Sequence, residues 1–135
     1  MKNVIFAAMA LATSASPAVA EVIECVLTKR NADWVPEQIL ILRDEKSGKI
    51  IVNDPLIAHF NKKPVEAALD RENAKRLTVK WSLENIVNQS GQRTLAFLYR
   101  ATYLKANKEI VVRAKPKGYG NEFEGRGKCT IRAKP

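Results

Sequence analysis

The chain has 135 residues, a formal net charge of +9 at pH 7, 46% hydrophobic residues, two cysteines and one histidine. The single histidine, His59, excludes any site that needs two imidazole ligands. The positive charge argues against an inhibitor of a basic lysozyme, because such an inhibitor needs an acidic surface.

The N-terminus has the features of a secretory signal peptide. An early lysine precedes the short apolar run Val4–Ala12, and small residues lead up to Ala20. The apolar run is too short to span a bilayer. We therefore expect a signal peptide over residues 1–20, cleaved between Ala20 and Glu21. The mature chain, residues 21–135, is then a single domain without a transmembrane segment, located in the periplasm or secreted.

The two cysteines lie near the two ends of the predicted mature domain. An even cysteine count in an exported protein indicates a disulfide, and Cys25 and Cys129 permit one intramolecular pairing. CxxC spacing is absent, so a redox or metal pair is the less favoured alternative. The sequence predicts a bridge that joins the first strand to the last.

The clearest strand pattern lies in Arg93–Lys115. Apolar side chains alternate with mixed ones from Leu95 to Tyr103, and the alternation resumes at Ile110 after a polar turn at residues 106–108. Successive strand side chains point to opposite faces, so this stretch predicts one long β-hairpin.

Other segments also read as short strands separated by turn residues. These are Val22–Lys29, Gln38–Arg43, Lys49–Asn53, Lys75–Leu83 and Lys128–Arg132. Between them, Leu56–Phe60 reads as a short apolar connection and Pro116–Gly127 as a glycine-rich loop. Pro64–Asn73 fits either a strand or a short helix opened by proline, and the alternation of the segment after it favours the strand.

Sequential strands joined by hairpin-length turns, with a covalent link between first and last, favour closure of the sheet. A closed sheet has no edge strands to invite aggregation. We therefore predict an all-β fold, a small antiparallel up-and-down β-barrel of about eight strands. The alternative is a two-sheet β-sandwich.

A barrel of eight strands is filled by side chains or holds one small ligand. The bulky inward candidates Leu77, Val79 and Leu95 belong to the interior. Aromatic residues could line a ligand site inside it or at its mouth. They are Trp81, Phe97, Tyr99, Tyr103, Tyr119 and Phe123. This arrangement resembles, in a general way, small exported β-barrels such as calycin-like carriers of apolar ligands.

The same alternation turns basic residues outward on neighbouring strands. The predicted anion-binding stripe consists of Arg76, Lys80, Arg100, Arg113, Lys115 and Lys117. Such a stripe attracts phosphate-rich or carboxylate-rich partners, which in an envelope are anionic lipid, glycan or acidic protein. The alternative is a general role in solubility and edge protection. Nucleic acid fits the charge but not the export signal.

Catalytic motifs are missing from the sequence. There is no Gly-x-Ser-x-Gly elbow, no clustered histidine and cysteine set, and the glycines from Gly118 to Gly127 match no phosphate-loop spacing. We therefore predict no catalytic residue, metal or cofactor, and leave an enzyme as a minor alternative. The expected function is that of an exported binding or envelope-accessory protein, with a carrier of a small apolar ligand as the second hypothesis.

Overall fold

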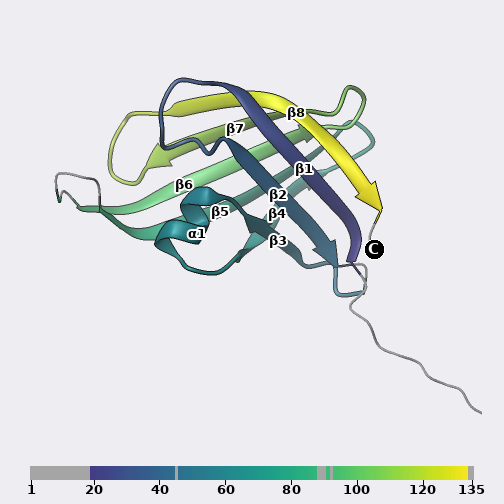
Figure 1. The fold of residues 1–135 in the computed structure, drawn as a ribbon, viewed down its shortest axis with the longest axis horizontal. Helices are drawn as coiled ribbons and strands as arrows, with labels where there is room; N and C mark the ends of the chain where they lie inside the picture. Colours follow the sequence, from purple (N-terminus) through teal and green to yellow (C-terminus); the bar gives the residue numbers. More distant parts are fainter. Residues whose placement is uncertain (1–18, 45, 88–90, 92, 134–135) are drawn as a thin grey trace, which may run out of the picture.

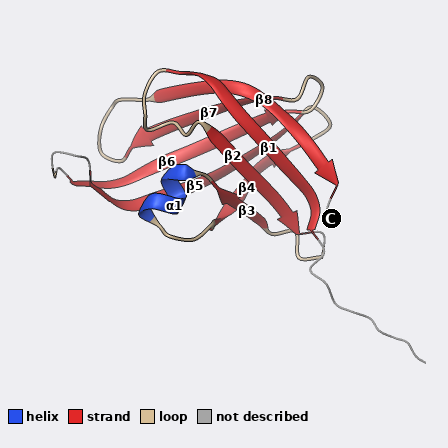
Figure 2. Ribbon diagram, viewed as in Figure 1, coloured by secondary structure: helices blue, strands red, loops and turns tan. Residues whose placement is uncertain are grey.

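The structure is a computed structural model that describes residues 19–44, 46–87, 91 and 93–133. The strands are β1 (Val19–Arg30), β2 (Gln38–Asp44), β3 (Ile50–Asn53), β4 (Val65–Glu72), β5 (Arg76–Val87), β6 (Arg93–Leu104), β7 (Glu109–Pro116) and β8 (Phe123–Ala133). Each strand pairs antiparallel with the next, and β8 pairs with β1 to close the barrel (Figures 1 and 2). The predicted up-and-down barrel is confirmed, and the alternative of a two-sheet sandwich is wrong.

The hydrophobic core fills the inside of the barrel. On β6 the period-2 pattern places Phe97, Tyr99, Ala101 and Tyr103 inside, each at most 5% exposed. Their partners on β5 are also buried apolar residues, Leu83, Trp81, Val79 and Leu77 in the same order. Leu95 is one residue of this face whose side chain lies outside the described part of the structure.

The disulfide closes the barrel where its two ends meet. Cys25 on β1 lies directly opposite Cys129 on β8, and the two sulfur atoms are bonded across 104 positions of the sequence. The predicted bridge is therefore confirmed. A disulfide of this kind fits an oxidising compartment such as the periplasm or the extracellular space.

The segment predicted as an apolar connection, Leu56–Phe60, is instead part of the helix α1 (Pro55–Phe60). Asp54 caps it, because its Oδ1 accepts a hydrogen bond from the Ile57 N–H at 2.7 Å, and proline fits the first turn. The helix packs against β5 and buries Ile57 completely. The strand chosen for Pro64–Asn73 is confirmed, since β4 occupies most of it.

The last strand begins earlier than predicted. Pro116–Gly127 was expected to be a loop as a whole, but β8 starts at Phe123, so that Gly125 and Gly127 lie within a strand. These two glycines allow β8 to pack closely against β1 and against Val35, which follows β1 in the chain. A Cβ at Gly125 would lie 2.5 Å from Cγ1 of Val35 and 2.9 Å from Cδ2 of Leu27. Gly118, by contrast, has a φ of +88° in the turn before the strand.

We expect Gly127→Ala to lower the free energy of unfolding by about 1–3 kcal/mol. A Cβ at this position would overlap the backbone oxygen of Val26 and lie 2.6 Å from the Cα of Leu27. These are backbone atoms of a paired strand, so they cannot move aside as a side-chain end can. Urea denaturation measures the change. Gly120→Ala is the matched control, because no atom lies within 4 Å of its added Cβ, and equal stability of the two variants would contradict the packing role.

The predicted signal peptide falls almost entirely on residues 1–18, outside the described residues, so cleavage after Ala20 stays a prediction. Within the described ranges, no helix is long and apolar enough to cross a membrane.

Candidate anion-binding face

Three cationic side chains form a row across the outside of neighbouring strands. Lys80 on β5 lies opposite Arg100 on β6, and Arg100 lies opposite Arg113 on β7. Their positions alternate with the buried residues of the same strands, so all three point away from the core. The side chains are 48%, 51% and 47% exposed, respectively. We refer to Lys80, Arg100 and Arg113 as the basic row.

A carboxylate lies at each end of the basic row. Asp70 on β4 forms ion pairs with both Lys80 and Arg100, and each side-chain nitrogen lies 3.2 Å from a carboxylate oxygen. At the other end, Glu124 on β8 pairs with Arg126 at 2.8 Å and with Arg113 at 3.4 Å. The hydrogen bond from Arg126 and the neighbouring charges lower the pKa of Glu124, so it is ionised at neutral pH. The two carboxylates offset part of the repulsion between the cations and hold their side chains in place.

A shallow cleft of about 390 Å³ opens beside the basic row. Its lining comes from three strands and the β7–β8 turn. The lining residues are Lys80, Leu98, Tyr99, Arg100, Arg113, Lys115 and Glu122. Four of the seven are cationic, and Lys115 makes no ion pair with any described residue. Guanidinium groups bind carboxylate or phosphate through two parallel hydrogen bonds, so the cleft suits an oxyanion.

The structure brings together four of the six residues predicted for the stripe. Lys80, Arg100, Arg113 and Lys115 line the cleft. Arg76 lies opposite Leu104, four residues before Lys80 on the same strand and hence about 13 Å away. Lys117 follows β7, where its backbone N–H donates to the Ala96 carbonyl oxygen at 2.8 Å.

Sequence reasoning missed several members of this face. It did not connect Asp70, Glu122 or Glu124 with the cations. Asp70 lies at an irregularity in the pairing of β4 with β5, between Leu69 and Arg71. No periodic pattern marks such a position, so its contact with the basic row was not visible in the sequence.

The aromatic residues predicted as a ligand lining divide between the interior and the surface. Trp81, Phe97, Tyr99 and Tyr103 are buried in the core, Phe123 is half-buried against Phe97, and Tyr119 is 59% exposed. Tyr119 therefore does not line the interior of the barrel.

The interior aromatic rings pack on one another. Trp81 stacks on Tyr99 with ring centroids 5.4 Å apart, and the Tyr99 hydroxyl donates to the backbone oxygen of Trp34 at 2.8 Å. Burial raises the pKa of Tyr99 well above its ordinary value, so the hydroxyl stays protonated and remains a donor. Trp81 Nε1 is buried and has no hydrogen-bond partner among the described residues.

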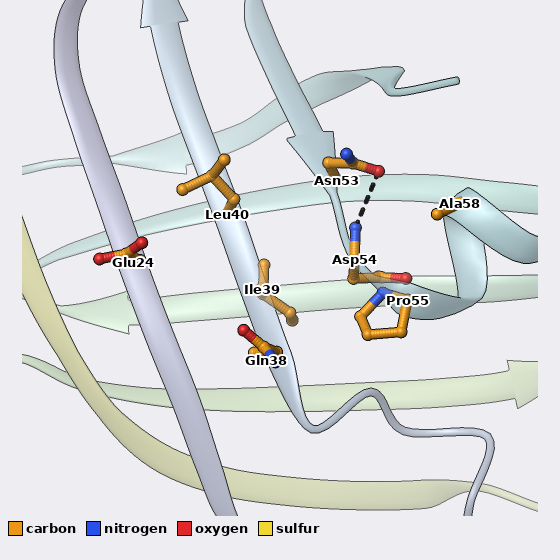
Figure 3. A pocket seen from close by; sticks show the side chains of 8 residues that line it. All are labelled: Glu24, Gln38, Ile39, Leu40, Asn53, Asp54, Pro55 and Ala58. Atoms are coloured by element: carbon orange, nitrogen blue, oxygen red, sulfur yellow. Dashed lines mark hydrogen bonds between the residues drawn. The ribbon is translucent and has the colours of Figure 1, made fainter. Parts of the chain in front are cut away.

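A second cleft, of about 260 Å³, lies on the side of the barrel away from the basic row. It is bordered by β1, β2, the end of β3 and the start of α1 (Figure 3). Glu24, Leu40 and Asn53 form one cross-strand row along it, and the Asn53 side chain accepts a hydrogen bond from the Asp54 N–H at 3.1 Å. None of the described residues that line this cleft is cationic, so it does not extend the anion-binding face.

The described residues contain no group of three or more histidine, cysteine, aspartate or glutamate side chains placed to hold a metal ion. The basic face, with four cations around one cleft, is the candidate functional site. Comparison of the chain with family models, with curated proteins and with solved structures gave no match.

Proposed function

We propose that this protein is an exported, non-enzymatic accessory protein of the cell envelope that docks an anionic component through the outer face of β5, β6 and β7. The observation that carries the proposal is the basic row of Lys80, Arg100 and Arg113, with Lys115 beside it around one cleft. The predicted signal peptide and the disulfide support the exported location.

Like charges directly opposite each other on a sheet destabilise it. The basic row contains two such pairs in succession, Lys80 with Arg100 and Arg100 with Arg113. The flanking carboxylates offset this repulsion only in part, because Glu124 also pairs with Arg126. An anion bound over the row would relieve the remaining repulsion, which is the physical reason to expect one there.

The spacing of the row suits an oxyanion-bearing partner. Neighbouring strands lie about 4.8 Å apart, so the three cations span about 10 Å and can contact one phosphate group or two adjacent ones. Their side chains are about half exposed, which keeps them accessible and preserves long-range attraction of a negatively charged partner.

The test is charge reversal of the basic row in the variant Lys80→Glu/Arg100→Glu/Arg113→Glu. We expect it to weaken binding of sodium polyphosphate, a soluble polyanion, by more than about tenfold in isothermal titration calorimetry, because each lost contact costs on the order of 1 kcal/mol. Wild-type binding should also weaken with added salt. Circular dichroism checks that the variant is folded.

The matched control is Lys46→Glu/Lys49→Glu/Arg76→Glu, which changes the net charge equally at exposed positions outside the cleft. We expect this control to keep most of the affinity for polyphosphate. An equal loss in both variants would overturn the proposal, because net charge and not the basic row would then account for the binding.

The carrier hypothesis receives less support from the interior. Trp34, Phe97, Tyr99 and Trp81 pack against one another with ring centroids 4.6 to 6.1 Å apart, so a ligand would have to displace them. The observation in its favour is that Trp81 Nε1 has no hydrogen-bond partner among the described residues, because a ligand with an acceptor atom would satisfy it. We therefore propose surface docking as the function.

A further inference from the structure

An exposed leucine lies within the anion-binding face. Leu98 on β6 is 45% exposed and lines the cleft together with the four cations. It lies directly opposite Lys115 on β7 and two residues before Arg100 on its own strand. Single exposed leucines are common on protein surfaces, but this one lines a cleft whose other six residues include four cations.

A second exposed apolar side chain lies on the turn beside Leu98. Residues 117–122 connect β7 to β8, and both ends of this turn lie against β6. The N–H of Lys117 donates to the Ala96 carbonyl oxygen, and Glu122 lines the same cleft as Leu98. Tyr119 lies between these two ends and is 59% exposed. Tyrosine prefers the boundary between an apolar phase and water, where its ring and its hydroxyl are both accommodated.

From this arrangement we infer that the anionic component is a lipid bilayer surface, and that Leu98 and Tyr119 enter its interface while the basic row and Lys115 contact lipid phosphates. The inference depends on the proposed function, because the same cations provide the attraction. It adds the class of partner.

A bilayer fits this face better than a soluble polyanion does. A glycan or polyphosphate offers charges but no apolar phase, and it would leave Leu98 and Tyr119 without a role. An anionic bilayer offers both, since its phosphates attract lysine and arginine near the surface and its acyl boundary accepts apolar side chains. Leu98 lines one cleft with the four cations, and Tyr119 belongs to the turn whose Glu122 lines the same cleft.

The experiment measures how strongly wild type, a test variant and a control variant bind two different anionic probes. The first probe is vesicles of phosphatidylglycerol mixed with phosphatidylcholine, measured by co-sedimentation, and the second is sodium polyphosphate, measured by calorimetry. The test variant is Leu98→Ser/Tyr119→Ser. The matched control is Val26→Ser, which removes another exposed apolar side chain that lies on β1 and does not line the cleft.

We expect the test variant to bind the anionic vesicles about tenfold more weakly than wild type and to bind polyphosphate with unchanged affinity, because about half of a leucine and of a tyrosine surface no longer enters the interface. The control variant should bind both probes as wild type does. Vesicles of phosphatidylcholine alone should bind much less.

Two results would overturn the inference and leave the proposed function standing. One is wild-type binding of polyphosphate without binding of anionic vesicles, which would indicate a soluble polyanion as the partner. The other is equal vesicle binding by wild type and by Leu98→Ser/Tyr119→Ser. If wild type binds neither probe, the proposed function itself fails.

Discussion

Removal of the Cys25–Cys129 disulfide is expected to lower the free energy of unfolding by about 4–5 kcal/mol. The bridge closes a loop of 104 positions, and in the chain-entropy model a cross-link of that length removes about this much free energy from the unfolded state. Domains of this size have total stabilities of about 5–15 kcal/mol. The loss is therefore a large fraction of the stability of the barrel. We expect the reduced protein to have a much lower melting temperature than the oxidised protein.

Urea denaturation of Cys25→Ala/Cys129→Ala, monitored by tryptophan fluorescence, measures this change. Both cysteines are buried, so the alanines add a packing loss of their own. Reduction of the wild-type protein without any substitution is the control that separates the two effects. A loss below about 1 kcal/mol on reduction would contradict the expected role, because it would mean that the β1–β8 pairing holds the two ends together unaided.

The second large effect is a pH dependence that originates at Asp54. This side chain is 7% exposed, its Oδ1 caps α1, and its Oδ2 has no hydrogen-bond partner among the described residues. Burial raises the pKa of Asp54 from 3.8 to about 6, although the N–H groups of Ile57 and Leu56 oppose part of the rise. Between these two values the folded protein holds a proton that the unfolded chain has released.

The contribution of Asp54 to stability therefore falls as the pH rises from about 4 to about 6. The difference of about two units corresponds to about 3 kcal/mol. Asparagine also caps helices and carries no charge, so Asp54→Asn retains the cap and loses the titration. We expect the stability of wild type relative to this variant to decrease by about 2 kcal/mol between pH 4 and pH 7 in urea denaturation, because part of the change lies below pH 4.

Asp44→Asn is the matched control for this measurement. The Ser47 hydroxyl and the Lys46 N–H lower the pKa of the exposed Asp44, so its contribution changes with pH in the opposite direction. Parallel pH profiles for wild type and Asp54→Asn would show that the buried carboxyl is not the source of the pH dependence.

The strands with strict alternation were predictable because the period of a strand is a local property. From Leu95 to Tyr103, and again from Ile110 to Ala114, every second side chain is apolar, and the structure places those that it describes inside the barrel. The disulfide was predictable for a different reason, since two cysteines leave one pairing. The closed barrel followed from both together.

The helix and the start of β8 were not predicted, because glycines occur in both loops and strands and a short apolar run fits either a helix or a connection. The sequence does contain the signal for α1, a capping Asp54 followed by Pro55, but the apolar run after it is as short as a connection between strands. Gly125 and Gly127 looked like loop residues. Their role depends on Val35, Val26 and Leu27, which are distant in the sequence.

The sequence by itself determined which residues face outward on each strand, because alternation is set by the backbone. It therefore supplied the basic residues of the docking face. Only the tertiary structure decided that Lys80, Arg100 and Arg113 lie in one row and that Arg76 does not, because the register between strands is fixed by pairing across the whole barrel. The position of Asp70 at the end of that row was decided in the same way, by an irregularity in pairing that no local pattern encodes.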